Sequence, residues 1–326
     1  MRAFVCKDLS DDLSGAVLVE DWPEPDPGAG EVKVQVRAAS LNFPDILMCQ
    51  GKYQHKPDLP FVVGMELAGE VVACGEGVDA YRPGDRVCGG FTKTGAFADY
   101  AVLKAEGLRR IPDNFDFAQA AAYGAAYLTA YVALVRRGRL DAGETLLVHG
   151  ASGGVGMAAV DVGRHLGAKV IATSSSDRKL ELLSDYGADH VINIRNGFRE
   201  KVKELTAGRG ADVIYDSIGG DVFDESTRCI AFDGRLLVIG FMSGRIAEVK
   251  TNIPLIKGFS VVGVRAGEYG RRFPERGREN LDTIWRWAAD GKMHPYIGER
   301  FSLPEIGLAI KKMMDRNFMG KLIIEP

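Results

Sequence analysis

The sequence has 326 residues, of which 46% are hydrophobic and 26% charged, with a formal net charge of −3. This length predicts two domains of ordinary globular composition. The near-neutral charge argues against nucleic acid or an anionic membrane as a partner, and the apolar runs look too short to cross a bilayer. The charged N-terminus does not resemble a signal peptide, so we expect a cytoplasmic protein.

The cysteines and histidines do not form a metal-binding or redox motif. The five cysteines are Cys6, Cys49, Cys74, Cys88 and Cys229. No two of them have CxxC spacing, so neither a zinc ribbon nor a dithiol site is indicated. The five histidines are dispersed as well. We therefore expect no metal site.

The first part of the chain is typical of a β-rich region. Residues 31–39 alternate polar and apolar side chains, which predicts a half-buried strand. Residues 66–75 and 84–90 are expected to form further strands, separated by Pro and Gly residues. We therefore expect an antiparallel, barrel-like region with few helices.

From about residue 117 the pattern becomes helical and then alternates. The Ala-rich stretch 117–138 is predicted to be a helix. Strands and helices then follow one another, which predicts a parallel, doubly wound sheet. The expected strands are 145–150, 168–175, 189–194, 211–219, 234–240 and 259–265, and the expected helices are 154–166, 176–187, 198–206 and 222–231. Beyond them we expect helices at 278–291 and 304–316 and a last strand at 320–326, and we expect this whole tail, 268–326, to pack back onto the first region.

A glycine-rich turn, "HGASGGVG" at 149–156, links the strand 145–150 to the helix that follows. Such a turn lets the backbone approach a ligand closely, and the helix N-terminus offers unpaired N–H groups to a diphosphate. The first glycine of the G-x-G-x-x-G pattern is replaced by Ala151. Because the turn has the right strand–helix context, it predicts dinucleotide binding through Ser152, Gly153, Gly154 and Val155.

The residues after the second strand of the alternating region favour NADPH over NADH. An NADH site usually has a carboxylate there, whereas this chain has Ser175 and Lys179, with Arg195 after the third strand. Hydroxyls and cations suit an additional phosphate. Asp177 is interpreted as an N-cap or first-turn residue of the next helix, and the alternative for Lys179 is a solvated helix lysine.

Several motifs together resemble one enzyme superfamily over nearly the whole chain. They include "GEVKVQVRAASLNFPDILMCQGKY", "LPFVVGMELAGEVVACGEGV", "RPGDRVCGG", "LLVHGASGGVGMAAV" and "GKLII". The chain resembles the medium-chain dehydrogenase/reductase superfamily, and in it the zinc-free NADPH:quinone oxidoreductase branch of the zeta-crystallin type. The resemblance implies an α/β fold with a GroES-like, β-rich catalytic domain at 1–124, completed by 268–326. It also implies a doubly wound Rossmann domain that binds NADPH at 125–267.

The resemblance also implies chemistry without zinc. The zinc enzymes of the superfamily hold their catalytic metal at positions that match Asn42, Met65 and Ala125 here. An amide, a thioether and a methyl group cannot replace two thiolates and an imidazole. Without a Lewis acid, hydride transfer to a conjugated acceptor is favoured, because the product anion is delocalised.

The site residues implied by the resemblance fall into two groups. Asn42, Asp45, Tyr53 and Arg265 are expected in the catalytic site, with Asn42 binding the nicotinamide ribose or donating to a substrate carbonyl. The alternatives are a structural acceptor for Asp45, a packed aromatic for Tyr53 and an interdomain ion pair with Glu268 for Arg265. Cofactor contacts are expected from Asn42, from the glycine-rich turn and from the three residues Ser175, Lys179 and Arg195 named above for the additional phosphate. Further contacts are expected from Thr129, Ser217, Gly240, Phe241, Met242, Ser243, Val264 and Asn317.

Three functions are compatible with these features. The first is reduction of a quinone by NADPH, and the second is reduction of an enone or of an enoyl-CoA such as acryloyl- or crotonyl-CoA. For the second, the charged run 265–279 would bind a phosphorylated acceptor, although a salt-bridged connector is its alternative role. The third is a non-catalytic cofactor-binding relative, crystallin-like or RNA-binding. A homodimer that pairs near 260–265 is expected from the family.

Overall fold

The structure is a computed structural model that describes residues 1–90 and 94–326. The chain forms two compact units, Met1–Ala125 with Pro295–Pro326, and Ala126–His294. The sequence predicted that the second domain would span 125–267. Its start agrees with the structure to within one residue, but the second unit ends at His294, 27 residues later than predicted (294 − 267). The difference arises because the long helix before Pro295 packs on the second unit. Within that unit Arg136 donates to Asn280 at 2.8 Å.

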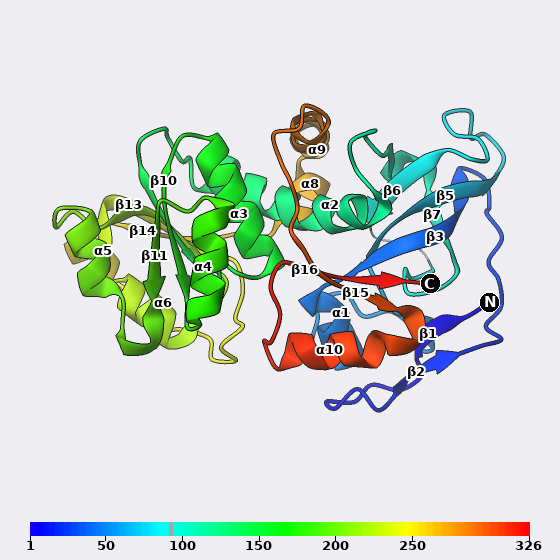
Figure 1. Cartoon of the computed structure of the whole chain (residues 1–326), viewed down its shortest axis with the longest axis horizontal. Coiled ribbons are helices and arrows are strands. Elements are labelled where there is room, and N and C mark those ends of the chain that lie inside the picture. The colour runs from blue at the N-terminus through cyan, green and yellow to red at the C-terminus, as the bar shows by residue number, and fades with distance from the viewer. Residues whose placement is uncertain (91–93) are drawn as a thin grey trace. The chain divides into compact units, whose positions relative to one another are not determined.

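The first unit is built around a seven-stranded sheet with the order β15-β16-β3-β5-β6-β8, in which β7 also pairs with β3. A second sheet has the order β2-β1-β4 (Figure 1). The strands are β1 Ala3–Cys6, β2 Ala16–Val19, β3 Glu31–Leu41, β4 Phe61–Val62, β5 Glu66–Cys74, β6 Arg86–Gly90, β7 Tyr100–Lys104, β8 Leu108–Arg110, β15 Ile297–Ser302 and β16 Lys321–Glu325. The expected β-rich character is thus confirmed, and β3, β5 and β6 lie close to their predicted ranges.

Two helices complete the core of the first unit. Helix α1 (Phe43–Cys49) contributes Ile46, and helix α10 (Ile306–Met314) contributes Met313 to the same apolar cluster as the strands. Two short 3₁₀ segments lie at Ala105–Gly107 and Leu303–Glu305. Because β16 lies between β15 and β3, the C-terminal strand is interior to the sheet.

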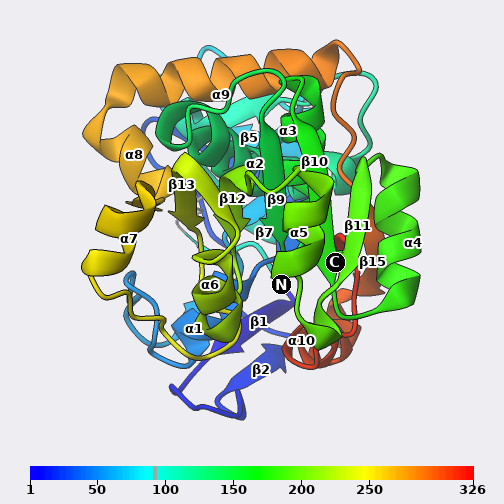
Figure 2. The ribbon, with the colours of Figure 1, turned by 90° about the vertical axis from the view of Figure 1, so that its left-hand side faces the viewer.

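The second unit contains a six-stranded parallel sheet with the order β11-β10-β9-β12-β13-β14. Figure 2 shows this sheet with β11 towards one edge and β13 towards the other. The strands are β9 Thr145–His149, β10 Lys169–Ser174, β11 His190–Asn193, β12 Ala211–Asp216, β13 Ile230–Val238 and β14 Ser260–Gly263. The predicted parallel, doubly wound sheet is confirmed.

Helices cover the sheet of the second unit. Val202 of α5 and Phe223 of α6 join Leu147, Ile171 and Ile214 of the sheet in one buried cluster, so these two helices cover one face. The helices are α3 Gly154–His165, α4 Asp177–Tyr186, α5 Arg199–Leu205, α6 Gly220–Ser226, α7 Asn252–Lys257, α8 Ala266–Arg272 and α9 Pro274–Ala289, with a 3₁₀ segment at Ile194–Asn196.

Helix α2 (Phe117–Tyr131) continues as a π-helix over Val132–Arg137. By length and composition, the combined helix Phe117–Arg137 is apolar enough to cross a membrane. The expectation that every apolar run is too short was therefore wrong for this helix. Of its apolar window, 67% is buried inside the fold, as in the core helix of a globular protein.

Candidate functional site

The glycine turn has the geometry that dinucleotide binding requires. Strand β9 ends at His149, and α3 begins after Gly153, which is its N-cap. Gly150 adopts a φ of +64°, and a Cβ on Gly156 would lie 2.2 Å from the carbonyl oxygen of Gly150. Glycine at 150 therefore allows the turn, and glycine at 156 allows the helix to pack against it. The N–H groups at the start of α3 are the unpaired donors that an anion can use.

The other predicted cofactor residues of the second unit lie where its strands end. Ser175 and Lys179 follow β10, Arg195 follows β11, and Ser217 follows β12. Residues 240–243 follow β13, and Val264 follows β14. Because all these strands are parallel, their carboxyl ends share one edge of the sheet, where open α/β folds bind ligands. Thr129 lies on α2 in the same unit and is half-buried.

The residues expected at the adenosine phosphate differ in exposure. Ser175 and Arg195 are exposed, whereas Lys179 is half-buried, and this burial lowers the pKa of its ammonium. Asp177 lies in the first turn of α4, and its carboxylate accepts a hydrogen bond from Asn193 at 2.6 Å. Its position agrees with the interpretation of Asp177 as a first-turn residue, whereas the N-cap of α4 is Ser176.

The segment after β13 is tied to the end of β12. Met242 N–H donates to the carbonyl of Ser217 at 3.2 Å, and Ser243 N–H donates to the carbonyl of Ile218 at 2.8 Å. Arg245 adds an ion pair with Asp221 at 2.8 Å and a second with Asp224. The segment that is expected to follow the nicotinamide half of the cofactor is therefore fixed to the turn beneath it.

Arg265 is the predicted catalytic residue in the second unit. It is the N-cap of α8, its side chain is 60% exposed, and its guanidinium lies 4.0 Å from Glu268. Glu268 also accepts from Arg271 at 3.1 Å and from Arg272 at 2.9 Å. Three arginines of the run therefore pair with Glu268, which agrees with a salt-bridged role for 265–279. The pair of Arg265 with Glu268 lies within the second unit, so it is not the interdomain pair that was considered.

In the first unit, Asn42 is part of a buried polar network that includes two residues not predicted from the sequence. The ammonium of Lys321 on β16 donates to Asn42 Oδ1 at 2.7 Å and to Glu66 Oε1 at 3.0 Å. Asn42 Nδ2 donates to Glu66 Oε1 at 2.9 Å, and Ala125 N–H donates to Glu66 Oε2 at 3.0 Å. Glu66 and Lys321 are each 5% exposed, so the network is shielded from water.

Asp45 lies beside this network and supports the start of α1. Its Oδ2 accepts from the backbone N–H of Asn42 at 2.8 Å, and the residue is 1% exposed. Burial, with a smaller contribution from the charge of Glu66, raises the pKa of Asp45 to about 8. Its other oxygen, Oδ1, has no hydrogen-bond partner among the described residues. The contact with Asn42 is the structural role considered for Asp45, and an acid with a raised pKa near Asn42 also suits proton transfer.

Tyr53 and Asn317 complete the predicted residues of the first unit. Tyr53 is half-buried in the bend after α1, and its hydroxyl has no hydrogen bond to the described part of the chain. Asn317 is exposed after α10, where its N–H donates to the carbonyl of Lys312 at 2.9 Å. Tyr53 is thus the predicted residue whose phenol is available as a donor.

The sequence carried little local signal for the two missed residues, Glu66 and Lys321. Glu66 follows Met65 in the "GME" motif, and Lys321 starts the apolar strand "KLIIE". A single charge next to an apolar strand is usually solvated, so nothing local indicates that Lys321 is buried.

The buried His149 at the end of β9 predicts sensitivity to acid. Its ring nitrogens lie 2.9 Å from the hydroxyls of Thr173 and Ser226, and burial lowers its pKa to about 3. Below the unfolded pKa of 6.5 only the unfolded chain gains this proton, so its contribution to stability is lost as the pH falls towards 3. Between pH 7 and pH 5 the wild-type protein should lose about 2 kcal/mol more unfolding free energy than His149→Gln.

Urea denaturation at both pH values measures this difference. His190→Gln removes an exposed histidine and serves as the control. Equal pH dependence of the wild type and His149→Gln would contradict the prediction.

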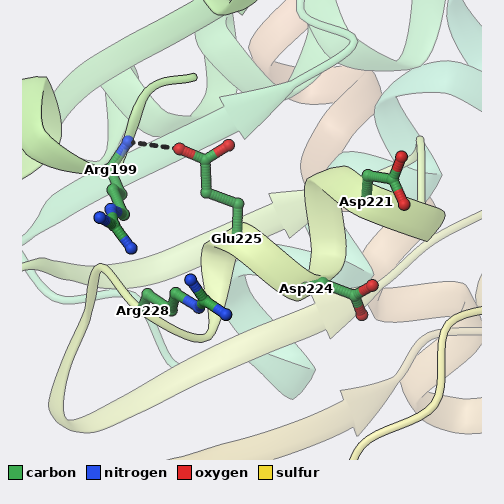
Figure 3. A pocket seen from close by; sticks show the side chains of 5 residues that line it. All are labelled: Arg199, Asp221, Asp224, Glu225 and Arg228. Carbon is green, nitrogen blue, oxygen red and sulfur yellow. Dashed lines mark hydrogen bonds between the residues drawn. The ribbon is translucent and has the colours of Figure 1, made fainter. Parts of the chain in front are cut away.

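A pocket of about 420 Å³ lies elsewhere on the second unit (Figure 3). It is lined by Arg199, Asp221, Asp224, Glu225 and Arg228. Glu225 uses its Oε1 to accept from the backbone N–H groups of Phe198 and Arg199 at 2.7 and 2.9 Å, which caps α5. Its lining includes none of the predicted site residues. The charges of both signs and the capping role of Glu225 indicate a structural rather than a ligand-binding function.

Comparison with known proteins places these observations in a family. Residues 28–113 match the alcohol dehydrogenase GroES-like domain, and residues 154–286 match the zinc-binding dehydrogenase family. A quinone oxidoreductase-like protein 2 homolog from Nematostella vectensis is 39% identical over 326 residues, which cover 99% of this chain and 88% of that protein.

Solved structures agree with this assignment. A quinone oxidoreductase from Pseudomonas syringae has a TM-score of 0.89 at 31% identity, with 100% of both chains covered. A mycobacterial protein complexed with NADPH has a TM-score of 0.91 at 29% identity, also with 100% of both chains covered. The chain is therefore an oxidoreductase that belongs to the medium-chain dehydrogenase/reductase superfamily, in its quinone oxidoreductase branch.

Proposed function

We propose that the protein transfers a hydride from NADPH to a quinone without the help of zinc. The glycine turn, Ser175 and Lys179 support NADPH as the cofactor, as does the similarity to the NADPH-complexed mycobacterial structure. When bound, NADPH supplies the hydride. The protein's own residues bind and orient the reactants and hold the proton that the reduced oxygen needs.

The observation that carries the proposal is the network of Lys321, Glu66 and Asn42. The family name implies zinc, but the matching positions hold the side chains of Asn42, Met65 and Ala125, which do not fit this metal. Asn42 and the backbone of Ala125 both bind Glu66, whose charge is balanced by the ammonium of Lys321. Within the described residues no three His, Cys, Asp or Glu side chains gather to hold a metal. A quinone suits such a site because its reduced anion is delocalised and needs only hydrogen bonds and a proton.

A substrate panel tests the proposal. NADPH oxidation with 1,4-benzoquinone and 9,10-phenanthrenequinone should be faster than with crotonyl-CoA or acryloyl-CoA, and a chelator should not change it. Preferential turnover of the thioesters would make the protein an enoyl-CoA reductase instead. NADPH binding without turnover of any acceptor would indicate the non-catalytic relative.

Replacing Tyr53 by Phe should lower turnover of the quinone by at least about tenfold, because the phenol would no longer donate its proton. The Michaelis constant for NADPH should hardly change. Tyr81→Phe is the matched control in the same unit, since the hydroxyl of Tyr81 already donates a hydrogen bond to the carbonyl of Leu108 at 2.7 Å. If Tyr53→Phe leaves turnover unchanged in steady-state assays, the phenol does not donate a proton and Tyr53 only packs in the site.

We also propose a cytoplasmic homodimer. Strand β14 is the edge of the parallel sheet, and Val261 on it is 38% exposed. Leu255 and Ile256 on the preceding helix are 80% and 73% exposed, which is unusual for large apolar side chains. Edge pairing of two β14 strands would cover this surface. Light scattering should give the mass of two chains, and fractionation of cells should place the chain in the cytoplasm.

A further inference from the structure

Strand β12 ends in a turn with two consecutive glycines, "DSIGG" at 216–220. The carboxylate of Asp216 uses Oδ1 to accept from the backbone N–H groups of Ile218 at 2.8 Å and of Gly219 at 2.9 Å. Asp216 is 1% exposed, so water cannot easily replace these two bonds. The side chain of Asp216 therefore fixes the path of the backbone at the carboxyl end of β12, where open α/β sheets bind their ligands.

This turn supports the segment 240–243, which is expected to follow the nicotinamide half of the cofactor. Met242 N–H donates to the carbonyl of Ser217, and Ser243 N–H donates to the next carbonyl along the chain. Both acceptors belong to the turn that the carboxylate of Asp216 holds. The position of the segment therefore depends on the shape of the turn.

The two glycines let the segment lie close to the turn. Gly219 and Gly220 adopt φ values of +70° and +59°, in the left-handed region that glycine enters without strain. A Cβ on Gly220 would lie 2.7 Å from Ser243 Oγ and 3.2 Å from its Cβ. A Cβ on Gly219 would lie 3.4 Å from the ring of Phe241. Side chains at these two positions would thus press against the segment.

A separate bond ties the same turn to the glycine-rich turn at 149–156. Ser217 Oγ donates to the carbonyl oxygen of His149 at 3.1 Å, and a Cβ on Gly150 would lie 2.5 Å from Ser217 Oγ. The carboxylate of Asp216 takes no part in this contact. Its removal would therefore free the backbone after Ser217 while the glycine-rich turn keeps its support.

We propose that Asp216 is a positioning residue for hydride transfer: by fixing Ile218 and Gly219, it holds the segment 240–243 ready for the nicotinamide half of NADPH. A segment that is already ordered increases the affinity, because binding does not have to order it. This inference rests on the proposed use of NADPH and does not depend on the acceptor.

Isothermal titration calorimetry with two ligands tests the inference. Asp216→Ala should raise the Kd of NADPH at least about tenfold. It should change the Kd of adenosine 2′,5′-bisphosphate less than about twofold, because this fragment lacks the nicotinamide half. Asp216→Asn keeps an oxygen that accepts from both N–H groups, so its Kd for NADPH should stay within about threefold of the wild-type value.

Asp212→Ala is the matched control on the same strand. Asp212 lies at the other end of β12 and accepts from the N–H of Thr145 at 2.8 Å, so its loss should lower stability but change neither Kd. The inference is overturned if Asp216→Ala leaves the Kd of NADPH unchanged or weakens the binding of both ligands equally. A Kd for NADPH as high in Asp216→Asn as in Asp216→Ala would also overturn it.

Should Asp216→Ala not fold, Gly220→Ala tests the same support from the other side. Its Cβ would displace Ser243, so this variant should raise the Kd of NADPH alone. Gly208→Ala is its control, since Gly208 has a φ of +84° but nothing within 4 Å of its Cβ position. Equal Kd values for NADPH in these two variants would contradict the inference. A wild-type protein that binds NADPH but reduces no quinone contradicts the proposed function alone, and one that binds neither ligand overturns both.

Discussion

Replacing Lys321 by Met is expected to lower the free energy of unfolding by about 3–5 kcal/mol, because the buried Glu66 would lose its counter-charge. The two side chains are each only 6% exposed, so water cannot take the place of the ammonium. Asn42 would lose its contact with Lys321 as well. Urea denaturation measures the change as a shift of the midpoint.

Two further variants make this prediction specific. Lys312→Met also breaks a lysine–glutamate pair, but with side chains 37% and 40% exposed, so it should cost less than about 1 kcal/mol. Lys321→Met/Glu66→Gln removes both charges and should recover much of the lost stability. If Lys321→Met lowers the free energy of unfolding no more than Lys312→Met does, the buried ion pair of Lys321 and Glu66 does not stabilise the fold as its burial indicates.

Replacing Gly156 by Ala is expected to destabilise the second unit by about 3 kcal/mol and to abolish tight binding of NADPH. The new Cβ would lie 2.2 Å from the carbonyl oxygen of Gly150 and 2.7 Å from the Cα of Ala151. Both are backbone atoms, so α3 would have to move away from β9. Thermal unfolding and fluorescence titration measure the two effects.

Gly153→Ala is the matched control for this prediction. Its φ is −83°, and a Cβ would meet only the carbonyl oxygen of Gly150, at 3.6 Å. The fold should therefore tolerate alanine at a cost below about 1 kcal/mol. The affinity for NADPH should still fall, because the methyl group would stand where the backbone approaches the diphosphate. Equal loss of stability in both variants would contradict the separate roles of the two glycines.

The sequence was most informative where chemistry and local structure coincide. The turn around Gly153 lies between a predicted strand and a predicted helix, and both elements were found within one residue of their expected ends. Helix α1 was not predicted, although Asn42 at its N-cap, a proline at its second position and Asp45 are typical of a helix start. Its seven residues were too short to show a helical period.

The polar network could not be predicted because its members are far apart in the sequence. Lys321 is separated from Asn42 by 279 positions and from Glu66 by 255. Only the sheet, in which β16 pairs with β3 and β3 with β5, brings them together. A local pattern contains no information on such pairing, and the alternation rule does not apply to β16, whose first four residues are all buried.

The first unit is formed by two segments that are far apart in the sequence, and this has a consequence for folding during synthesis on the ribosome. The second unit, Ala126–His294, is one uninterrupted segment and can complete its sheet while translation continues. The first unit emerges earlier but must wait for Pro295–Pro326, since β16 lies between β15 and β3. Until then the edge of β3 is unpaired and Glu66 has no ammonium beside it. The nascent chain thus completes its second unit before its first, and a chaperone that covers the unpaired edge of β3 during this interval would favour correct folding.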